Sequence, residues 1–214
     1  METLNEYWIE ACVDSVESAV SAEKNGANRL ELCSHLEVDG LSPSIDLVKE
    51  VLDAVTIPVK VMIRPRQGNF LYTQKELLKM TGTIYAMKDI GVYGIVFGIL
   101  NKYNLVDSVN TASLAEVAKP LNVTFHKAID YTSDLIKNVE VLNDITSVDA
   151  ILTSGGKATA MHGKPIINEL YDTYGTSGRR LEIIAAGRIT HEKLDLHKEE
   201  LKTTSLHGRH IVES

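Results

Sequence analysis

The chain has 214 residues, 44% of them hydrophobic, which suffices for one domain with a full core but not for two ordinary domains. Its 22 Lys and Arg against 29 Asp and Glu give a formal net charge of −7, which argues against nucleic-acid binding and against an anionic membrane surface. The two cysteines do not make a disulfide framework, and the acidic opening run does not resemble a signal peptide. We therefore expect residues 1–214 to form a single cytoplasmic domain without nucleic-acid or membrane partners.

Short apolar runs alternate with helical patterns along the whole sequence. The runs begin near Trp8, Arg29, Val59, Gly94, Val123, Ala150, Glu182 and Thr204. Such alternation predicts parallel strands joined by right-handed crossovers, and eight units predict an α/β fold of the (β/α)8 TIM-barrel type. An open doubly wound sheet is the alternative, but the glycine-rich phosphate fingerprint that would follow its first strand is absent.

Helix-start signals stand between these runs. Asp14 with Glu17 and Thr73 with Glu76 have the spacing of capping boxes. Ser42–Pro43 supplies an N-cap followed by proline at the first helical position. The sequence therefore predicts helices that begin directly after these residues.

The end of the chain is unusually short for this architecture. Only residues 208–214 follow the eighth apolar run, enough for at most two helical turns, so we expect a shortened or missing eighth helix. Because that helix would cover apolar strand surface, its absence predicts a homodimer.

Several ionisable residues share the parity that points into the barrel. They are Glu10, Glu31, Arg64, His126 and His207, each near the C-terminal end of its strand. Charges inside a barrel are costly unless paired, so this group is either a structural ion-pair network or, given its position at the catalytic end of the fold, an active site. In the second interpretation Glu10 or Glu31 is the general base, His126 the acid, and Arg64 a bidentate clamp for an anion.

Glycine-containing loops follow the sixth and seventh runs. Their free backbone N–H groups suit a phosphate, although small residues also serve simply to make tight turns. The residues expected to contact such a ligand are Ser154, Gly155, Gly156 and Gly187, with Arg66 and Asp130 on the same rim. Lys60 has inward parity but lies toward the bottom, and Lys127 has outward parity, so a Schiff-base lysine is not supported.

These residues also carry a family likeness. The strings Met62-Ile63-Arg64-Pro65-Arg66, Phe70-Leu71-Tyr72, Ile95-Val96-Phe97-Gly98, Val123-Thr124-Phe125-His126, Leu152-Thr153-Ser154-Gly155 and Leu206-His207-Gly208, together with Glu31-Leu32-Cys33, resemble the CutC copper-homeostasis family. The resemblance implies a TIM barrel, a cytoplasmic location and a link to copper(I) handling.

Two functions remain open. In the first, Cys12 and Cys33, inward on neighbouring strands that lie about 4.8 Å apart, bind Cu(I) with help from the Met62 thioether. The adjacent carboxylates are expected to raise the thiol pKa and oppose this binding. In the second, an enzyme of isomerase, aldolase or lyase type acts on a small phosphorylated or carboxylated metabolite in the cup. Both functions require a small-molecule anion or Cu(I) as partner and no organic cofactor.

Overall fold

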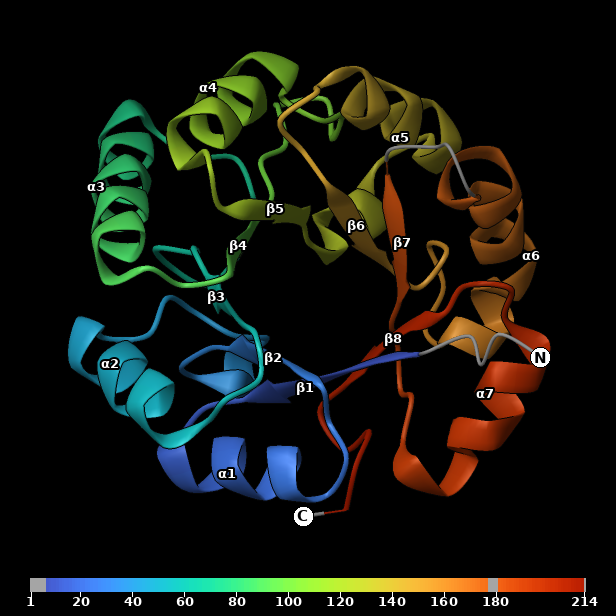
Figure 1. Ribbon diagram of the computed structural model, residues 1–214. Helices are drawn as coiled ribbons and strands as arrows, with labels where there is room; N and C mark the ends of the chain where they lie inside the picture. The colour runs from blue at the N-terminus through green and yellow to red at the C-terminus, as the bar shows by residue number, and fades with distance from the viewer. Residues whose placement is uncertain (1–6, 177–180, 214) are drawn as a thin grey trace.

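The computed structural model describes residues 7–176 and 181–213, and Figure 1 shows a ring of helices around a closed barrel. Eight parallel strands pair in sequential order, and the last closes on the first. The strands are β1 (Trp8–Val13), β2 (Arg29–Leu32), β3 (Val59–Met62), β4 (Gly94–Phe97), β5 (Asn122–Phe125), β6 (Ala150–Thr153), β7 (Glu182–Ala185) and β8 (Ser205–Gly208). The predicted TIM barrel is confirmed, with every strand start within one residue of its expected position.

Seven α-helices in the described residues cover the barrel. They are α1 (Val16–Lys24), α2 (Ile45–Ala54), α3 (Gln74–Ile90), α4 (Ser108–Ala118), α5 (Leu135–Asp144), α6 (Ala160–Leu170) and α7 (Leu194–Glu200). Short helical turns η1 (Leu36–Val38), η2 (Lys127–Tyr131), η3 (Tyr171–Gly175) and η4 (His191–Lys193) lie in the loops.

Two of the expected helix starts are wrong by one or two residues. The hydroxyl of Ser15, not Asp14, caps α1 and forms a box with Ser18, because the Ser18 side chain returns to the Ser15 backbone N–H. Helix α2 uses Ser44 as its N-cap, and Pro43 lies before the helix. The capping box of Thr73 opens α3 as predicted.

No eighth helix follows β8 in the residues that the structure describes, as predicted. Residues 209–213, which follow β8, form no helix; instead His210 bridges to Thr190 and Ile211 is fully buried. Leu206 on β8 is also fully buried, so the tail and neighbouring elements cover this strand. The predicted homodimer stays a prediction.

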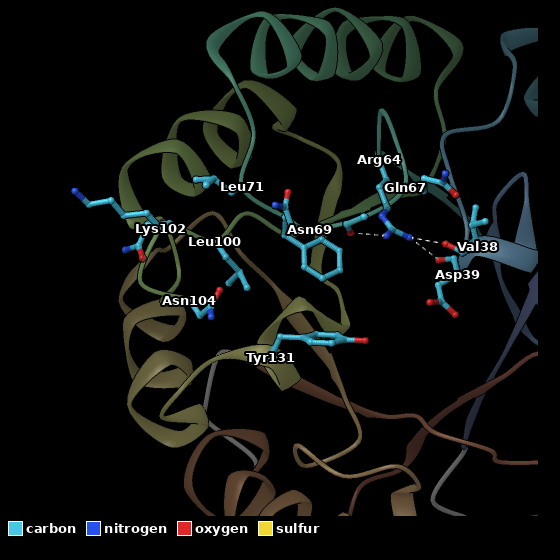
Figure 2. Close-up of a pocket in the computed structure, with 13 residues that line it drawn as sticks. Val38, Asp39, Arg64, Gln67, Asn69, Leu71, Leu100, Lys102, Asn104 and Tyr131 are labelled. Atoms are coloured by element: carbon cyan, nitrogen blue, oxygen red, sulfur yellow. Dashed lines mark hydrogen bonds between the residues drawn. The ribbon is translucent and has the colours of Figure 1, made fainter.

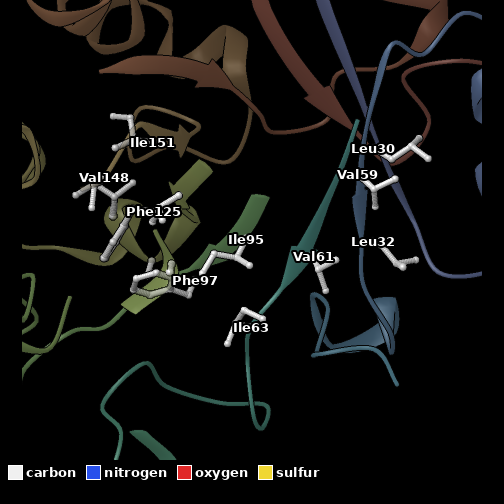
Figure 3. Close-up of a cluster of buried hydrophobic side chains, with 14 of the residues drawn as sticks. Leu30, Leu32, Val59, Val61, Ile63, Ile95, Phe97, Phe125, Val148 and Ile151 are labelled. Carbon is white, nitrogen blue, oxygen red and sulfur yellow. The ribbon is translucent and has the colours of Figure 1, made fainter. Parts of the chain in front are cut away.

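The hydrophobic core is a shell between strands and helices. Outward residues of β2, β3 and β4 such as Leu30, Val61 and Ile95 are fully buried against the helix ring (Figure 3). Since this shell removes most of the apolar surface from water, inward positions are left available for polar side chains. No helix in the described ranges is long and apolar enough to span a bilayer.

Candidate functional site

The lower interior of the barrel holds a closed ion-pair network. Arg29, which has the same inward parity on β2, contacts Glu10 on β1 through Nε and Glu182 on β7 through Nη2 at 2.9 Å. Lys60 is fully buried, donates to Thr124 Oγ1 at 2.8 Å and lies 3.6 Å from Glu10. These opposite charges overcome the desolvation of Glu10, so the pKa of its carboxyl is far below its usual value.

His207 connects this network to the layer above. Its Nδ1 lies 2.9 Å from Glu10 Oε1 and 3.4 Å from Glu31 Oε2. Burial opposes its charge, but the two carboxylates and Cys12 raise the His207 pKa to about 10, so the ring is an imidazolium at neutral pH. Glu31 differs from Glu10, because burial raises its pKa to about 8. Of the two expected bases, Glu31 is thus the one that exchanges a proton near neutrality.

The two cysteines meet above His207, although they are not in register. Cys12 pairs with Glu31 across the strands, so Cys33 lies two residues further along the chain, directly after the end of β2. Their side chains converge nevertheless, and the sulfurs are 3.9 Å apart. Met62 and Cys33 belong to one buried cluster, against which Cys12 packs. Two thiols and a thioether therefore share one side of the cup.

The carboxylates raise the pKa of both thiols as expected, through Glu10 for Cys12 and Glu31 for Cys33, but for Cys12 other contacts outweigh them. The hydrogen bond from Cys33 and the charge of His207 outweigh burial, so the Cys12 pKa is lowered to about 5. The Cys33 pKa is raised well above its usual value by Cys12, burial and Glu31. The pair therefore contains one thiolate and one thiol at neutral pH, with the thiolate stabilised by the imidazolium.

His126 occupies the opposite wall as a neutral ring. The Ala128 N–H donates to its Nδ1 at 3.1 Å, which assigns the proton to Nε2. Gly98 permits this position, because a Cβ there would lie 2.5 Å from Nδ1. Burial, followed by the charge of Arg64, lowers the His126 pKa to about 3. His126 is therefore a neutral ring at neutral pH and not the protonated acid that was expected, and its Nε2 has no hydrogen-bond partner in the described residues.

Arg64 and Arg66 hold loops together. Arg64 donates through Nη1 to the carbonyls of residues 38–40 and through Nη2 to Gly68 O. Arg66 pairs with Glu76 and donates to the carbonyls of Asn69 and Leu71. Arg64 therefore does not form the predicted bidentate clamp for an anion, because loop carbonyls already accept from both of its terminal nitrogens. Its buried Nε has no hydrogen-bond partner in the described residues.

The glycine loop after β6 already contains an anion, the side chain of Asp130. Its carboxylate accepts from the N–H groups of Ser154 and Gly156, from the hydroxyl of Thr153, and from Lys127 Nζ at 2.7 Å. The predicted phosphate nest is therefore corrected: the loop binds a carboxylate of the same chain. These contacts and the positive charge of Lys127 lower the Asp130 pKa despite burial.

The loop after β7 is tightly packed. A Cβ at Gly187 would lie 2.9 Å from that of Ser154, and the carbonyl of Gly187 accepts from Ala160 N. This geometry favours the turn-making interpretation for Gly187. Gly155 N–H likewise donates within its own loop, to Thr153 Oγ1.

A cavity of about 260 Å³ lies between these walls. Its lining includes Met62 and six of the thirteen predicted site residues, namely Cys12, Glu31, Cys33, Arg64, His126 and His207, whereas Glu10, Arg66, Asp130 and the predicted glycine-loop residues do not line it. We call it the cup. Three polar atoms of cup residues, Glu31 Oε2, Arg64 Nε and His126 Nε2, are buried without a hydrogen-bond partner within the described part of the chain. Buried groups of this kind are costly, and a bound ligand would satisfy them.

A second, larger cavity adjoins the cup. It measures about 640 Å³ and shares Asp39, Arg64, Phe70 and Tyr131 with it. We call it the outer pocket; Figure 2 shows Tyr131 beneath it and Arg64 at one side.

Sequence reasoning missed several of these residues. Arg29 and Glu182 have inward parity at the start of their strands, and that parity was signal enough to find them. Lys127 was expected to point outward, yet it lines the cup, because η2 turns the chain back over the barrel mouth directly after β5. The larger cavity is built from loops whose course no periodicity predicts.

These features define a class: a TIM barrel with a closed ionic floor and an open, sulfur-containing cup at the C-terminal ends of the strands. The family model described as the CutC family matches residues 7–212, and the chain belongs to this family.

Individual proteins agree with that assignment. The chain is 40% identical over 203 residues to the copper homeostasis protein cutC homolog of Mus musculus, covering 95% of this chain and 73% of that protein. It is 38% identical over 199 residues to a CutC family protein of Pasteurella multocida, covering 93% and 80%.

Solved structures separate family from fold. The crystal structure of CutC from Streptococcus agalactiae superposes with a TM-score of 0.88 at 29% identity, covering 96% of this chain and 100% of that one. A dihydrodipicolinate synthase of Bacillus anthracis superposes with a TM-score of 0.65 at 13% identity, covering 95% and 70%, which shows a shared fold alone.

Proposed function

We propose that this protein binds Cu(I) in the cup through Cys12 and Cys33, with the Met62 thioether as a neighbouring soft ligand. The observation that carries the proposal is the 3.9 Å separation of the two sulfurs inside a cavity. Thiolate and thioether ligands prefer Cu(I) among the common cellular metals. The relatives named copper homeostasis proteins support a role in copper handling.

The electrostatics of the pair favour binding of a soft cation. Cys12 is already a thiolate at neutral pH, so only Cys33 must lose a proton when the ion binds. Cys33 donates to Glu31 Oε1 at 3.6 Å, and because the Glu31 pKa of about 8 keeps that carboxyl mostly protonated at neutral pH, the proton that Cys33 loses passes to solvent. His207, held by Glu10, balances the negative charge of the two thiolates.

Competition against a chromophoric Cu(I) chelator under anaerobic conditions tests the proposal. We expect one Cu(I) per chain in the wild type and a weakening of at least about 100-fold, or about 2.7 kcal/mol, in Cys12→Ser and in Cys33→Ser. Thr153→Ser keeps its hydroxyl away from the sulfurs and serves as the matched control, with unchanged affinity. Single cysteine variants that bind copper as tightly as the wild type would contradict the paired site.

A second candidate function is catalysis on a small carboxylated or phosphorylated metabolite in the same cup. It is favoured by the buried His126 Nε2, a neutral donor without a partner, opposite Glu31, whose pKa of about 8 suits a general base. In this function His126 holds a ligand oxygen while Glu31 moves a proton.

A thermal-shift screen of hydroxy acids, keto acids and sugar phosphates tests the second candidate. His126→Asn is the informative variant, because the Asn oxygen still accepts from Ala128 N–H while the ring donor is lost. A ligand that stabilises the wild type and not His126→Asn would support the site. Equal stabilisation of both would contradict the role given to His126.

A further inference from the structure

The outer pocket has no role in copper coordination or in the cup chemistry. Its volume of about 640 Å³ is that of a pocket for a small organic molecule, and it adjoins the cup, with which it shares four lining residues. A molecule bound there therefore lies next to the cavity that holds the sulfurs.

The walls of the outer pocket match a peptide-like ligand. Four carboxamide side chains contribute to the lining, from Gln67, Asn69, Asn101 and Asn104. Apolar patches come from Val38, Leu71 and Leu100 between them. Amide groups beside aliphatic surface suit a ligand that itself consists of amides and short aliphatic links.

Charges of opposite sign lie at the two ends of the outer pocket. Figure 2 shows Lys102 at one end and Asp39, beside Arg64, at the other. Lys102 is exposed and Asp39 is exposed, so both are accessible to a ligand. A zwitterion that carries carboxylates and an ammonium group complements this arrangement, whereas a highly charged anion does not.

Hydrogen bonds within the chain hold both walls of the outer pocket without a ligand. Arg66 fixes the loop of residues 67–71 from below, and Leu100 N–H donates to Phe70 O at 2.9 Å. Asn101 Oδ1 accepts from Tyr103 N and Leu105 N, which fixes the second wall. A preformed site loses less conformational entropy on binding.

Access to the cysteines limits the kind of copper donor. Cys33 is 1% exposed, and the cup that contains it measures about 260 Å³. A metal-binding loop of a folded protein would not fit in this space. A single thiol of a small molecule would fit, with the rest of the molecule outside.

We propose that the outer pocket binds the body of a low-molecular-weight, zwitterionic peptide thiol whose sulfur delivers Cu(I) to Cys12 and Cys33. The inference rests on the proposed copper function and adds the donor. The exchange needs no oxidant: copper stays Cu(I), the two protein sulfurs replace the donor thiolates as its ligands, one departing thiolate takes the proton that Cys33 loses, and any other takes a proton from solvent. The Cys12 sulfur attacks first because it is the more exposed of the two.

Two measurements with glutathione as the probe test the proposal. The first is saturation-transfer NMR of metal-free, reduced glutathione with the apo-protein. The second is the rate of Cu(I) transfer from Cu(I)–glutathione as a function of its concentration. Both measurements use the variants Lys102→Glu and Asn104→Gly. Glycine is chosen at position 104 because Asn104 has a φ of 54°, which glycine adopts without strain. Lys75→Glu, an equal charge change on the exposed surface of α3, is the control.

We expect glutathione to bind the apo-protein, the transfer rate to saturate, and the half-saturating concentration to rise about fivefold in the pocket variants, with the control unchanged. The equilibrium Cu(I) affinity of these variants should equal that of the wild type. Tight copper binding combined with no glutathione binding and a linear, variant-independent rate would overturn this inference alone. Loss of equilibrium copper binding in the wild type would overturn the proposed function and the delivery step with it.

Discussion

The buried ion-pair network of Glu10, Arg29, Lys60 and Glu182, which we call the floor, lies below the cup. Both layers use inward positions of the barrel strands, yet they differ in how their polar side chains are hydrogen-bonded. In the floor, each charge of Arg29, Lys60 and Glu182 contacts a partner. In the cup, Glu31 Oε2 and His126 Nε2 have no hydrogen-bond partner within the described residues. The inward charges are thus mutually paired in one layer, whereas the next layer keeps unpartnered polar atoms, and it is in this second layer that we propose a ligand binds.

Removing Arg29 should have the largest effect. Arg29→Ala leaves two carboxylates, Glu10 and Glu182, without their cation in a buried setting, which costs about 3 to 5 kcal/mol of unfolding free energy. Urea denaturation at pH 7 measures it, with Lys49→Ala on the surface of α2 as the control. A loss below 1 kcal/mol would mean that the floor is not the structural layer.

The hydrogen bonds between Asp130 and the glycine loop after β6 should stabilise the fold, as the ion pairs of the floor do. Asp130→Ala removes a carboxylate that accepts from two backbone N–H groups, so we expect a loss of about 2 to 3 kcal/mol. Asp144→Ala, an exposed carboxylate at the end of α5, should change stability by less than about 0.5 kcal/mol. Added phosphate that restores the stability of Asp130→Ala would indicate that the loop accepts an external anion.

Cysteine reactivity distinguishes the two thiols of the cup. With a pKa of about 5, Cys12 should be alkylated by iodoacetamide at pH 5.5, whereas Cys33 should not react. His207→Gln removes the neighbouring cation and should slow Cys12 alkylation roughly tenfold at this pH. His191→Gln, on the surface, is the control, and peptide mapping identifies the modified residue. Equal reactivity of both cysteines would contradict the thiolate–thiol pair.

The smallest effect is a pH dependence of stability. Because the folded pKa of His126, about 3, is lower than its unfolded value of 6.5, its contribution is complete above pH 6.5 and is lost as the pH falls toward 3. The wild type should lose about 1 kcal/mol more than His126→Asn between pH 6.5 and 5.5. Parallel stability curves for the two proteins would show that folding does not lower the pKa of His126.

The sequence predicted the barrel well because a TIM barrel depends on local periodicity. Alternation of apolar runs and helical patterns located all eight strands, and the short chain end predicted the missing helix. Period-two parity also placed Glu10, Glu31 and His207 together inside.

The predictions that the structure corrected concern contacts between segments that are distant in the sequence. The register that offsets Cys12 from Cys33 is set by pairing between strands, which parity within one strand does not determine. The sequence also does not predict that Asp130 accepts from the glycine loop or that loop carbonyls accept from Arg64. A sequence shows which groups can donate, but not which acceptor the fold brings next to them. The pKa of His126 depends on burial by the fold in the same way.

X-ray absorption at the copper edge of the Cu(I)-loaded protein tests the central claim most directly. The account predicts a first shell of sulfur ligands, from Cys12 and Cys33 with or without Met62, that loses sulfur in Cys33→Ser. A first shell of nitrogen and oxygen alone, unchanged in Cys33→Ser, would contradict the claim that the cup is a soft-metal site.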